Sequence, residues 1–557
     1  MSGRFSVLAA VLADATLRRL ELAYLLFAIG EWATWVAVIV YAYDRGGAAE
    51  AGIVAFVELA PAVVLAPTVA TLGDRFPRIR VLLGTYASQA ALMAATAVAL
   101  VQSGPPLVVY VLATLTATAV SWSRPLHASL MPEVITRPDD LTAANVVSGM
   151  AESAGSLIGP LGAGALIALD GPFLVFAVTA AGLALSSLLL LDLARRAGRP
   201  TAGPDPEVLG IAAVDQPRTT WWAELTGGLA AIAADRRLLA VLAIATWATF
   251  LVGALDILYA VLAIDLLDLG SSGVGYLGAL GGVGATIGSA GALLLVGRER
   301  LGLALGGSAA LFGVALAAIG GVPETAPALV LLATAGIGSG LTVVAAQTLI
   351  QRLAGDDVMS RVFGVLQGLA MGATAVGALA VPLVIALVGE RLAFIVIGVS
   401  LPLAFVALGR AIRDADRVAP HRLEELRLLR AVPMLGPLSA PVLERLAADA
   451  VRVDVEAGTT VIRAGDRGDR FYVVVDGELD VDVSGRDVRR LRPGDGFGEI
   501  ALVRDVPRTA TITTLTPTAL IAIDREPFLS ALTGQARSGA IAAGIADRHL
   551  AGDRGRA

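Results

Sequence analysis

Long apolar stretches between Leu20 and Ala411 are the feature that most limits what this chain can fold into. A helix needs about 20 apolar residues to cross the hydrocarbon core of a bilayer, and twelve such stretches can be placed. They lie approximately at 20–43, 52–72, 80–102, 105–124, 143–168, 172–194, 237–263, 272–296, 301–321, 326–350, 362–388 and 392–411. The mean hydropathy is +0.76. The sequence therefore predicts an all-α membrane domain of twelve transmembrane helices.

Arginines in the short connections predict the orientation of these spans. One set of connections carries Arg18, Arg19, Arg75, Arg78, Arg80, Arg124, Arg137, Arg195, Arg196, Arg199, Arg236, Arg237, Arg298, Arg300, Arg352 and Arg361. The other set carries Arg45 and Arg391. Because cytoplasmic loops are enriched in basic residues, both termini and everything after Ala411 are predicted to be cytoplasmic. The expected location is the cell (inner or plasma) membrane, crossed many times.

An internal repeat divides the membrane part into two halves. The motif WATW at Trp32 recurs as WATF at Trp247, and GDRFPRIR at Gly73 has a shorter counterpart, GRER, at Gly297. The sequence predicts two six-helix pseudo-repeats, 1–194 and 237–411, joined by a cytoplasmic linker at 195–236. A substrate path is expected between the halves, near the bilayer midplane.

The segment LGDRFPRIRVL, after the second predicted span, resembles the signature loop of the major facilitator superfamily, which has the form G-x-L-A-D-R-x-G-R-R. The resemblance implies the fold of that superfamily, and it implies that this loop gates the cytoplasmic side. The implied gating residues are Gly73, Asp74, Arg75, Arg78 and Arg80. Pro77 stands where the family often has glycine. A solvated loop selected only by charge asymmetry is the alternative for the arginines.

The run GSLIGPLGAG is similar to the glycine-proline motif in the fifth span of proton-linked exporters of that superfamily. Gly155, Gly159 and Pro160 would let helices approach closely, and the resemblance implies a role in restricting leak. Small-residue packing without any such role is the alternative. The stretch PEVITRPDDLTAAN looks like the subgroup that includes siderophore and macrolide exporters and lysophospholipid transporters.

Three acidic residues fall inside predicted spans: Glu31, Glu58 and Asp256. A charged side chain near the bilayer centre costs at least about 2.5 kcal/mol, so its presence calls for a reason. We expect these carboxylates to bind the coupling proton or to line the substrate cavity. A structural hydrogen bond to a neighbouring helix is the alternative reading.

The pattern changes after Ala411. A charged helical connector is predicted at 412–440, and the remaining 441–557 alternates apolar and polar residues in short segments. Strands are predicted at VRVDV from Val451, TTVIR from Thr459, RFYVVV from Arg470, ELDVDV from Glu478, VRRL from Val488, ATITTL from Ala510 and ALIAI from Ala519. The prediction is a small β-roll with flanking helices, at roughly 527–532 and 538–550.

The segments GDRGDRFYVVVDGELDV and GDGFGEIALVRDVPRTATI resemble the cyclic nucleotide-binding domain, the second being its phosphate-binding cassette. Gly498 lets backbone approach the ligand, Arg508 supplies a forked cation for the cyclic phosphate, and Glu499 suits the ribose 2′-hydroxyl. The implied site comprises Phe497, Gly498, Glu499, Ile500, Ala501, Leu502, Pro507, Arg508, Thr509 and Ala510. A C-terminal helix could cover the base through Ile541 or Ile545, or it could simply cap the domain. cAMP is favoured over cGMP as the ligand, although the cassette itself does not decide between them.

These features predict a proton-coupled exporter that works by alternating access and responds to a cyclic nucleotide. A lipid or lysolipid flippase of the same fold and a non-transporting membrane-anchored nucleotide receptor are the alternatives. No enzyme is expected, since no nucleophile, metal cluster or nucleotide-triphosphate loop is apparent. Cysteine is absent and the three histidines are far apart in the sequence, so no metal site is indicated. The net charge of −6 does not indicate nucleic-acid binding. The expected partners are the bilayer, a small-molecule or lipid substrate and the nucleotide, with monomer and homodimer both open.

Overall fold

The computed structural model describes residues 14–65, 76–134, 138–196, 221–292, 301–322, 324–354, 356–436, 438, 440–483 and 486–533. The chain forms two compact units. The first comprises 1–354 and 358–413, and the second comprises 355–357 and 414–557.

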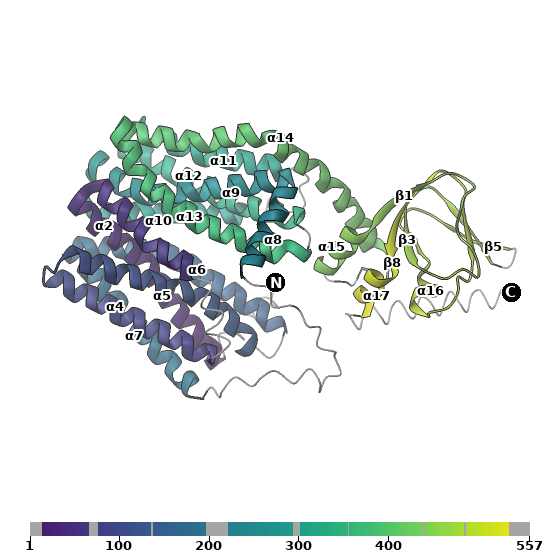
Figure 1. The fold of residues 1–557 in the computed structure, drawn as a ribbon, viewed down its shortest axis with the longest axis horizontal. Coiled ribbons are helices and arrows are strands. Elements are labelled where there is room, and N and C mark those ends of the chain that lie inside the picture. The colour runs from purple at the N-terminus through teal and green to yellow at the C-terminus, as the bar shows by residue number, and fades with distance from the viewer. Residues whose placement is uncertain are drawn as a thin grey trace. The chain divides into compact units, whose positions relative to one another are not determined.

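Helices make up the described part of the first unit (Figure 1). They are α2 (Ala15–Leu65), α4 (Arg78–Val101), α5 (Pro106–Val134), α6 (Pro138–Asp170), α7 (Pro172–Arg196), α8 (Trp221–Ala234), α9 (Arg236–Ala260), the π-helical η1 (Val261–Leu266), α10 (Gly270–Gly291), α11 (Leu301–Ile319), α12 (Thr325–Leu353), α13 (Asp356–Val388) and α14 (Glu390–Ala431). Helix α8 lies inside the segment predicted as a linker. The boundary between the two units falls within α14.

Ten helices in the described part are long and apolar enough to cross a membrane. One of them, α2, contains the first predicted span and residues 52–65 of the second, as two arms separated by a kink. The kink residues Gly46 (φ −141°, ψ 21°) and Gly47 (φ 61°, ψ −157°) are not helical, and the positive φ of Gly47 suits glycine because it has no Cβ. Helix α10 matches the eighth predicted span but is not among the ten. The count of twelve therefore stays a prediction.

The chain reverses direction at each short turn, so the helix ends gather at two ends of the bundle. The turns at Gly47, Gly171 and Gly389 share one end, here called the Gly47 end. Helix α4 begins at the other end, here called the Arg78 end. Helices α2 and α4 to α7 form the first half, and α9 to α14 form the second (Figure 1).

Small residues let α6 approach helices of both halves. A Cβ added at Gly155 would lie 2.6 Å from the Cβ of Ala28 in α2, and one added at Gly159 would lie 2.7 Å from the carbonyl oxygen of Ile29. A Cβ added at Gly275 of α10 would lie 2.4 Å from the carbonyl oxygen of Pro160. The glycine-proline motif thus lies where α6 contacts α2 and where it contacts the second half.

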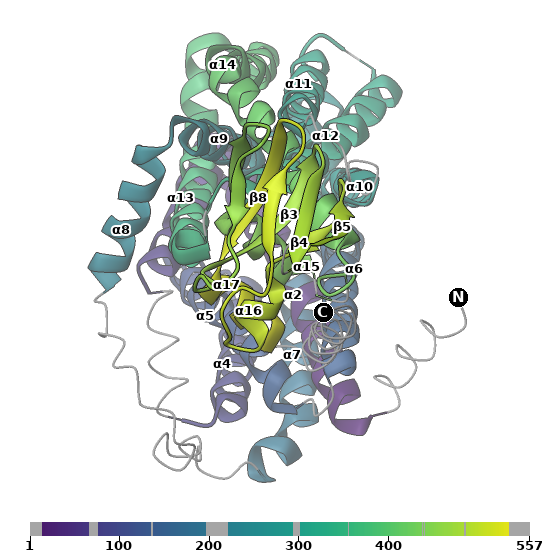
Figure 2. The same cartoon turned by 90° about the vertical axis from the view of Figure 1, so that its right-hand side faces the viewer.

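The second unit contains two four-stranded antiparallel sheets, which lie toward the viewer in Figure 2. Their strands are β1 (Val451–Val455), β2 (Thr460–Ile462), β3 (Arg470–Asp476), β4 (Leu479–Val483), β5 (Arg486–Leu491), β6 (Gly496–Phe497), β7 (Thr511–Thr514) and β8 (Thr518–Asp524). The sheet orders are β1-β8-β3-β6 and β2-β7-β4-β5. Each of the seven predicted strand segments is confirmed. The two-residue β6 was not predicted.

Three shorter helices flank the sheets: α15 (Ala440–Asp449), α16 (Glu499–Val503) and α17 (Arg525–Thr533). Phe528 of α17 stacks on Phe471 of β3, with 4.5 Å between ring centroids. Both rings are fully buried. This core fixes β3 against α17 and so supports the loop between β6 and β7 that carries the cassette.

Candidate functional site

The cassette begins at a backbone turn that only glycine fits. Gly498 follows β6, has a φ of 90° and is the N-terminal cap of α16. A Cβ added there would lie 2.6 Å from Nη1 of Arg508 and 3.1 Å from the carbonyl oxygen of Arg470. The chain therefore brings a bare backbone against the guanidinium group, which is the close approach that a phosphate cradle requires.

The Arg508 side chain is held in one orientation from two directions. Its Nη1 donates to the carbonyl oxygen of Gly498 at 2.9 Å, and its Nη2 donates to that of Arg470 at 2.7 Å. Nη2 also lies 3.4 Å from Oδ1 of Asp469. Arg508 is 6% exposed, and this burial lowers the pKa of its guanidinium from the usual value. Since free arginine has a pKa above 12, the group remains a cation suited to a phosphate.

The other cassette residues differ in how far they are buried. Glu499 is 3% exposed at the first position of α16. Phe497 stacks on Tyr472, with 5.2 Å between ring centroids. Ala501 and Leu502 are buried, Pro507 is exposed, and Ile500, Thr509 and Ala510 are half-buried. Ile541 and Ile545, predicted as a lid, lie outside the described residues.

Gly498→Ala is expected to weaken cAMP binding at least about tenfold. The new Cβ would strain a left-handed backbone, by about 1–2 kcal/mol, and it would also displace Arg508. Gly494→Ala is the matched control, because Gly494 has a φ of 91° and nothing within 4 Å of an added Cβ. Calorimetric titration of both variants, with thermal unfolding beside it, separates the two effects. Equal affinity of the two variants would contradict the importance of the close approach.

A second group of polar residues lies inside the first half. Arg124 Nη1 donates to Oε1 of Glu31 at 2.9 Å, its Nη2 pairs with Oε1 of Glu152, and its Nε donates to Oε2 of Glu152 at 3.3 Å. We call Glu31, Arg124 and Glu152 the Glu31 cluster. The prediction that Arg124 lies in a connection is wrong: α5 continues to Val134, so this arginine is within a candidate span.

Two aromatic side chains add hydrogen bonds to the Glu31 cluster. The hydroxyl of Tyr24 donates to Oε2 of Glu152 at 3.0 Å, and the indole nitrogen of Trp32 lies 3.5 Å from its Oε1. The side chains of Arg124 and Glu152 are nevertheless 41% and 33% exposed. Each residue of the cluster takes part in a hydrogen bond, and two of the three are partly exposed. Oε2 of Glu31 is buried without a hydrogen-bond partner among the residues described.

Glu152 of the Glu31 cluster lies on a face of α6 whose next turns contact the second half. Ser156 and Pro160 follow Glu152 by one and two helical turns, so the three share a face. A Cβ added at Gly282 of α10 would lie 3.1 Å from the carbonyl oxygen of Ser156. Glu152 therefore lies one turn of α6 closer to the Arg78 end than the contact of Ser156 with α10.

The other predicted intramembrane acids have different surroundings. Asp256 of α9 accepts a side-chain hydrogen bond from Trp35 of α2, so it joins the two halves. Glu58 is 6% exposed, and its Oε2 is buried without a hydrogen-bond partner among the residues described. The structure does not bring Glu58 or Asp256 into the Glu31 cluster.

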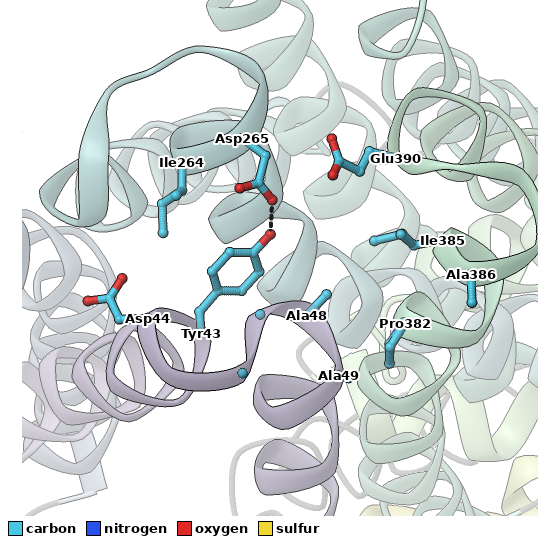
Figure 3. A pocket seen from close by; sticks show the side chains of 12 residues that line it. Tyr43, Asp44, Ala48, Ala49, Ile264, Asp265, Pro382, Ile385, Ala386 and Glu390 are labelled. Carbon is cyan, nitrogen blue, oxygen red and sulfur yellow. Dashed lines mark hydrogen bonds between the residues drawn. The ribbon is translucent and has the colours of Figure 1, made fainter.

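At the Gly47 end, a cavity of about 540 Å³ lies between the kink of α2 and the second half. Figure 3 shows the hydroxyl of Tyr43 hydrogen-bonded to Asp265, with Glu390 near that carboxylate. Ser271 donates to Asp44 at 2.8 Å beside this cavity. Both hydrogen bonds join α2 to the second half.

The predicted gating loop is described only in part. Gly73, Asp74 and Arg75 lie outside the described residues. Arg78 Nη1 donates to the carbonyl oxygen of Ser129 at 3.1 Å, and Arg80 Nε donates to that of Ala194 at 3.1 Å. A cation near the C-terminal carbonyls of a helix is favourable, so these arginines tie α4 to α5 and α7.

Two protein-family models match this chain. The family model described as Major Facilitator Superfamily matches residues 20–378. The model described as cyclic nucleotide-binding domain matches residues 452–534.

Two individual relatives each match about a fifth of this chain. A cAMP-dependent protein kinase regulatory subunit of Yarrowia lipolytica is 39% identical over 102 residues, which is 18% of this chain and 27% of the relative. An uncharacterized protein of Mycobacterium tuberculosis is 39% identical over 99 residues, 18% of this chain and 20% of the relative. The chain thus spans less than a third of the length of these relatives.

A solved structure also matches about a fifth of this chain. The regulatory domain of Toxoplasma gondii PKA, crystallised with cAMP, is 32% identical and covers 20% of this chain and 44% of that one. The TM-score is 0.19, which carries no weight for the fold.

Proposed function

We propose that this chain, which belongs to the Major Facilitator Superfamily, is a secondary active transporter that exports a small molecule in exchange for protons. A cyclic nucleotide bound to its C-terminal domain would regulate the transport. The proposal includes no enzymatic step.

The Glu31 cluster carries this proposal. One guanidinium group lies between two carboxylates, so it can compensate only one of two negative charges. An uncompensated charge inside a membrane is costly, and a proton on Glu31 or Glu152 would remove it. Arg124 and Glu152 are partly exposed, and Glu152 lies one helical turn from the contact of α6 with α10 of the second half. A transported molecule would pass between the halves. The position of the cluster supports exchange of that proton for substrate.

Alternating access requires the halves to separate at one end while they touch at the other. The Tyr43–Asp265 and Ser271–Asp44 hydrogen bonds join the halves at the Gly47 end. We infer that this conformation is open toward the Arg78 end, and that the arginine-rich Arg78 end is cytoplasmic. The ten candidate spans, with α2 counted as two arms and α10 added, would make the twelve spans of the proposed topology.

We propose cAMP as the regulatory ligand. The cassette provides a buried, oriented guanidinium beside the backbone of Gly498, and a relative named for cAMP supports the choice of nucleotide. Since the boundary between the units lies within α14, this helix is the covalent route by which occupancy of the cassette would reach the transporter. Nucleotide shifts the transporter only if it binds the cassette better in one transporter state than in another.

The test uses the purified full chain in proteoliposomes that contain a pH-sensitive dye. A panel of small amphiphilic compounds and lysophospholipids is added, and proton movement is recorded for each. We expect at least one small molecule to drive proton movement above that of protein-free vesicles. Movement driven only by lysophospholipids would make the chain a lipid transporter. No movement with any compound, together with tight nucleotide binding, would replace the transporter by a membrane-anchored receptor.

A further inference from the structure

A second polar group lies beside the Glu31 cluster and takes one residue from each of three helices. Ser148 of α6 donates its hydroxyl to Oε1 of Glu21 in α2 at 2.7 Å. Nε2 of His127 in α5 lies 3.3 Å from the same hydroxyl oxygen. The imidazole and the carboxylate are 3.7 Å apart at Nε2 and Oε1. The serine therefore bridges an acid and a base that do not bond directly. We call these three residues the His127 group.

The acid and the base of this group are both buried. Glu21 and His127 are each 3% exposed. Oε2 of Glu21 and Nδ1 of His127 have no hydrogen-bond partner among the residues described. Buried polar atoms are normally paired, and an unpaired one needs an explanation. Two unpaired atoms, one on an acid and one on a neighbouring base, indicate a site that binds and releases a proton.

The hydrogen bonds of Ser148 identify the atom that would take the proton. A hydroxyl has one hydrogen to donate, and the carboxylate of Glu21 is a closer and stronger acceptor than the carbonyl oxygen of Ala144 at 3.1 Å. Nε2 of His127 must then be the donor to the serine oxygen. Because Nε2 already carries a hydrogen, Nδ1 is the nitrogen that binds or releases a further proton.

Tyr24 connects this group to the Glu31 cluster. Its ring stacks on the imidazole of His127, with centroids 3.9 Å apart and planes 11° apart. Its hydroxyl donates to Glu152, which pairs with Arg124. An aromatic face favours a cation placed over it. Tyr86 of α4 is another titratable group nearby, and its buried hydroxyl has no hydrogen-bond partner among the residues described.

We propose that Glu21, Ser148 and His127 form a second proton-binding site, which exchanges protons with the Glu31 cluster. On uptake a proton adds to Nδ1 of the neutral imidazole, and the carboxylate of Glu21 balances the imidazolium. On release the same N–H bond breaks and the proton passes to water or to a carboxylate of the Glu31 cluster. Glu21 precedes Glu31 by ten positions in α2, about 15 Å along a helix, so this site is nearer the Arg78 end. The exchange rests on the proton coupling proposed above, whereas proton binding at His127 does not.

The binding site is tested by nuclear magnetic resonance of the full chain with isotope-labelled histidine. The chain has three histidines, so His127→Gln identifies the signal of His127. We expect the neutral imidazole of His127 to carry its hydrogen on Nε2, and we expect a signal from the imidazole protonated at both nitrogens to grow as the pH is lowered. Glu21→Gln should weaken the doubly protonated signal, because the balancing carboxylate is lost. A His127 signal that stays singly protonated at every pH at which the chain is folded would overturn the proposal, even if Glu21→Gln does not fold. So would a doubly protonated signal of equal strength in Glu21→Gln and in the unmodified chain.

The exchange is tested by the pH profile of substrate-driven proton movement in proteoliposomes. His127→Gln should flatten the profile, and the matched control His421→Gln should leave it as in the unmodified chain. Equal profiles for the two variants would overturn the exchange. Absence of movement in the unmodified chain would contradict the proposed transport alone, because the resonance titration still decides the site.

Discussion

Arg508→Lys is expected to raise the dissociation constant for cAMP about 10- to 100-fold, and Arg508→Ala is expected to abolish measurable binding. Loss of one hydrogen bond to a charged group costs about 1.5–3 kcal/mol, and lysine offers a single ammonium in place of the planar fork. The fork matters here because the guanidinium already spans two backbone carbonyls, those of Gly498 and Arg470. Calorimetric titration of the full chain measures the effect.

Arg452→Lys is the matched control for this substitution. Arg452 is exposed in β1 and lies 3.9 Å from Asp454 at its nearest atoms, so its replacement should leave affinity and thermal stability unchanged. If Arg508→Lys bound cAMP as tightly as Arg452→Lys, the cassette would not hold the phosphate through Arg508. A large loss of thermal stability in Arg508→Lys would assign the arginine to folding instead.

Glu31→Gln is expected to reduce substrate-driven proton movement at least about tenfold. Glutamine keeps the shape of the side chain and can still accept from Arg124, but it cannot bind and release a proton. The remaining carboxylate, Glu152, would then be fully compensated by the guanidinium, so the cluster would have no reason to take up a proton. Substrate counterflow, which needs no net proton transfer, should persist and would show that the variant is folded.

Asp192→Asn is the matched control for Glu31→Gln. Asp192 also pairs with an arginine, Arg19, at 3.2 Å, but its side chain is 46% exposed. Surface pairs of this kind contribute little, so proton movement should be unchanged. Full proton movement in Glu31→Gln would remove Glu31 from the coupling site and leave the pair with Arg124 as a structural contact.

The sequence predicts the second unit in more detail than the first because its signals are local. Alternation of apolar and polar residues located seven strands, and the resemblance of one continuous segment to the cyclic nucleotide-binding domain singled out Gly498 and Arg508. The strand β6 was not predicted because two residues are too few to show alternation. The hydrogen bond from Arg508 to the carbonyl oxygen of Arg470 was not predicted. Arg470 lies in β3, far from Arg508 in the sequence, and no local sequence pattern shows that the two residues meet.

The membrane unit was predicted at the level of spans, and its site was predicted in part. Glu31 stood out because a charge inside an apolar stretch is rare. Glu152 carried the same signal inside the fifth predicted span and was missed. Arg124 was assigned to a connection because its span was taken to end there, ten residues before α5 ends. The pairing of these residues, and of Glu21 with His127, depends on which helices pack together.

We propose that nucleotide bound at Arg508 controls proton-coupled transport through the membrane unit. The most direct measurement is substrate-driven proton movement by the full chain in proteoliposomes, with and without saturating cAMP on the side of the cassette. We expect cAMP to change the rate for the unmodified chain and to leave the rate of Arg508→Ala unchanged. A rate that cAMP does not alter, in a chain shown by calorimetry to bind cAMP, would show that the nucleotide does not control transport.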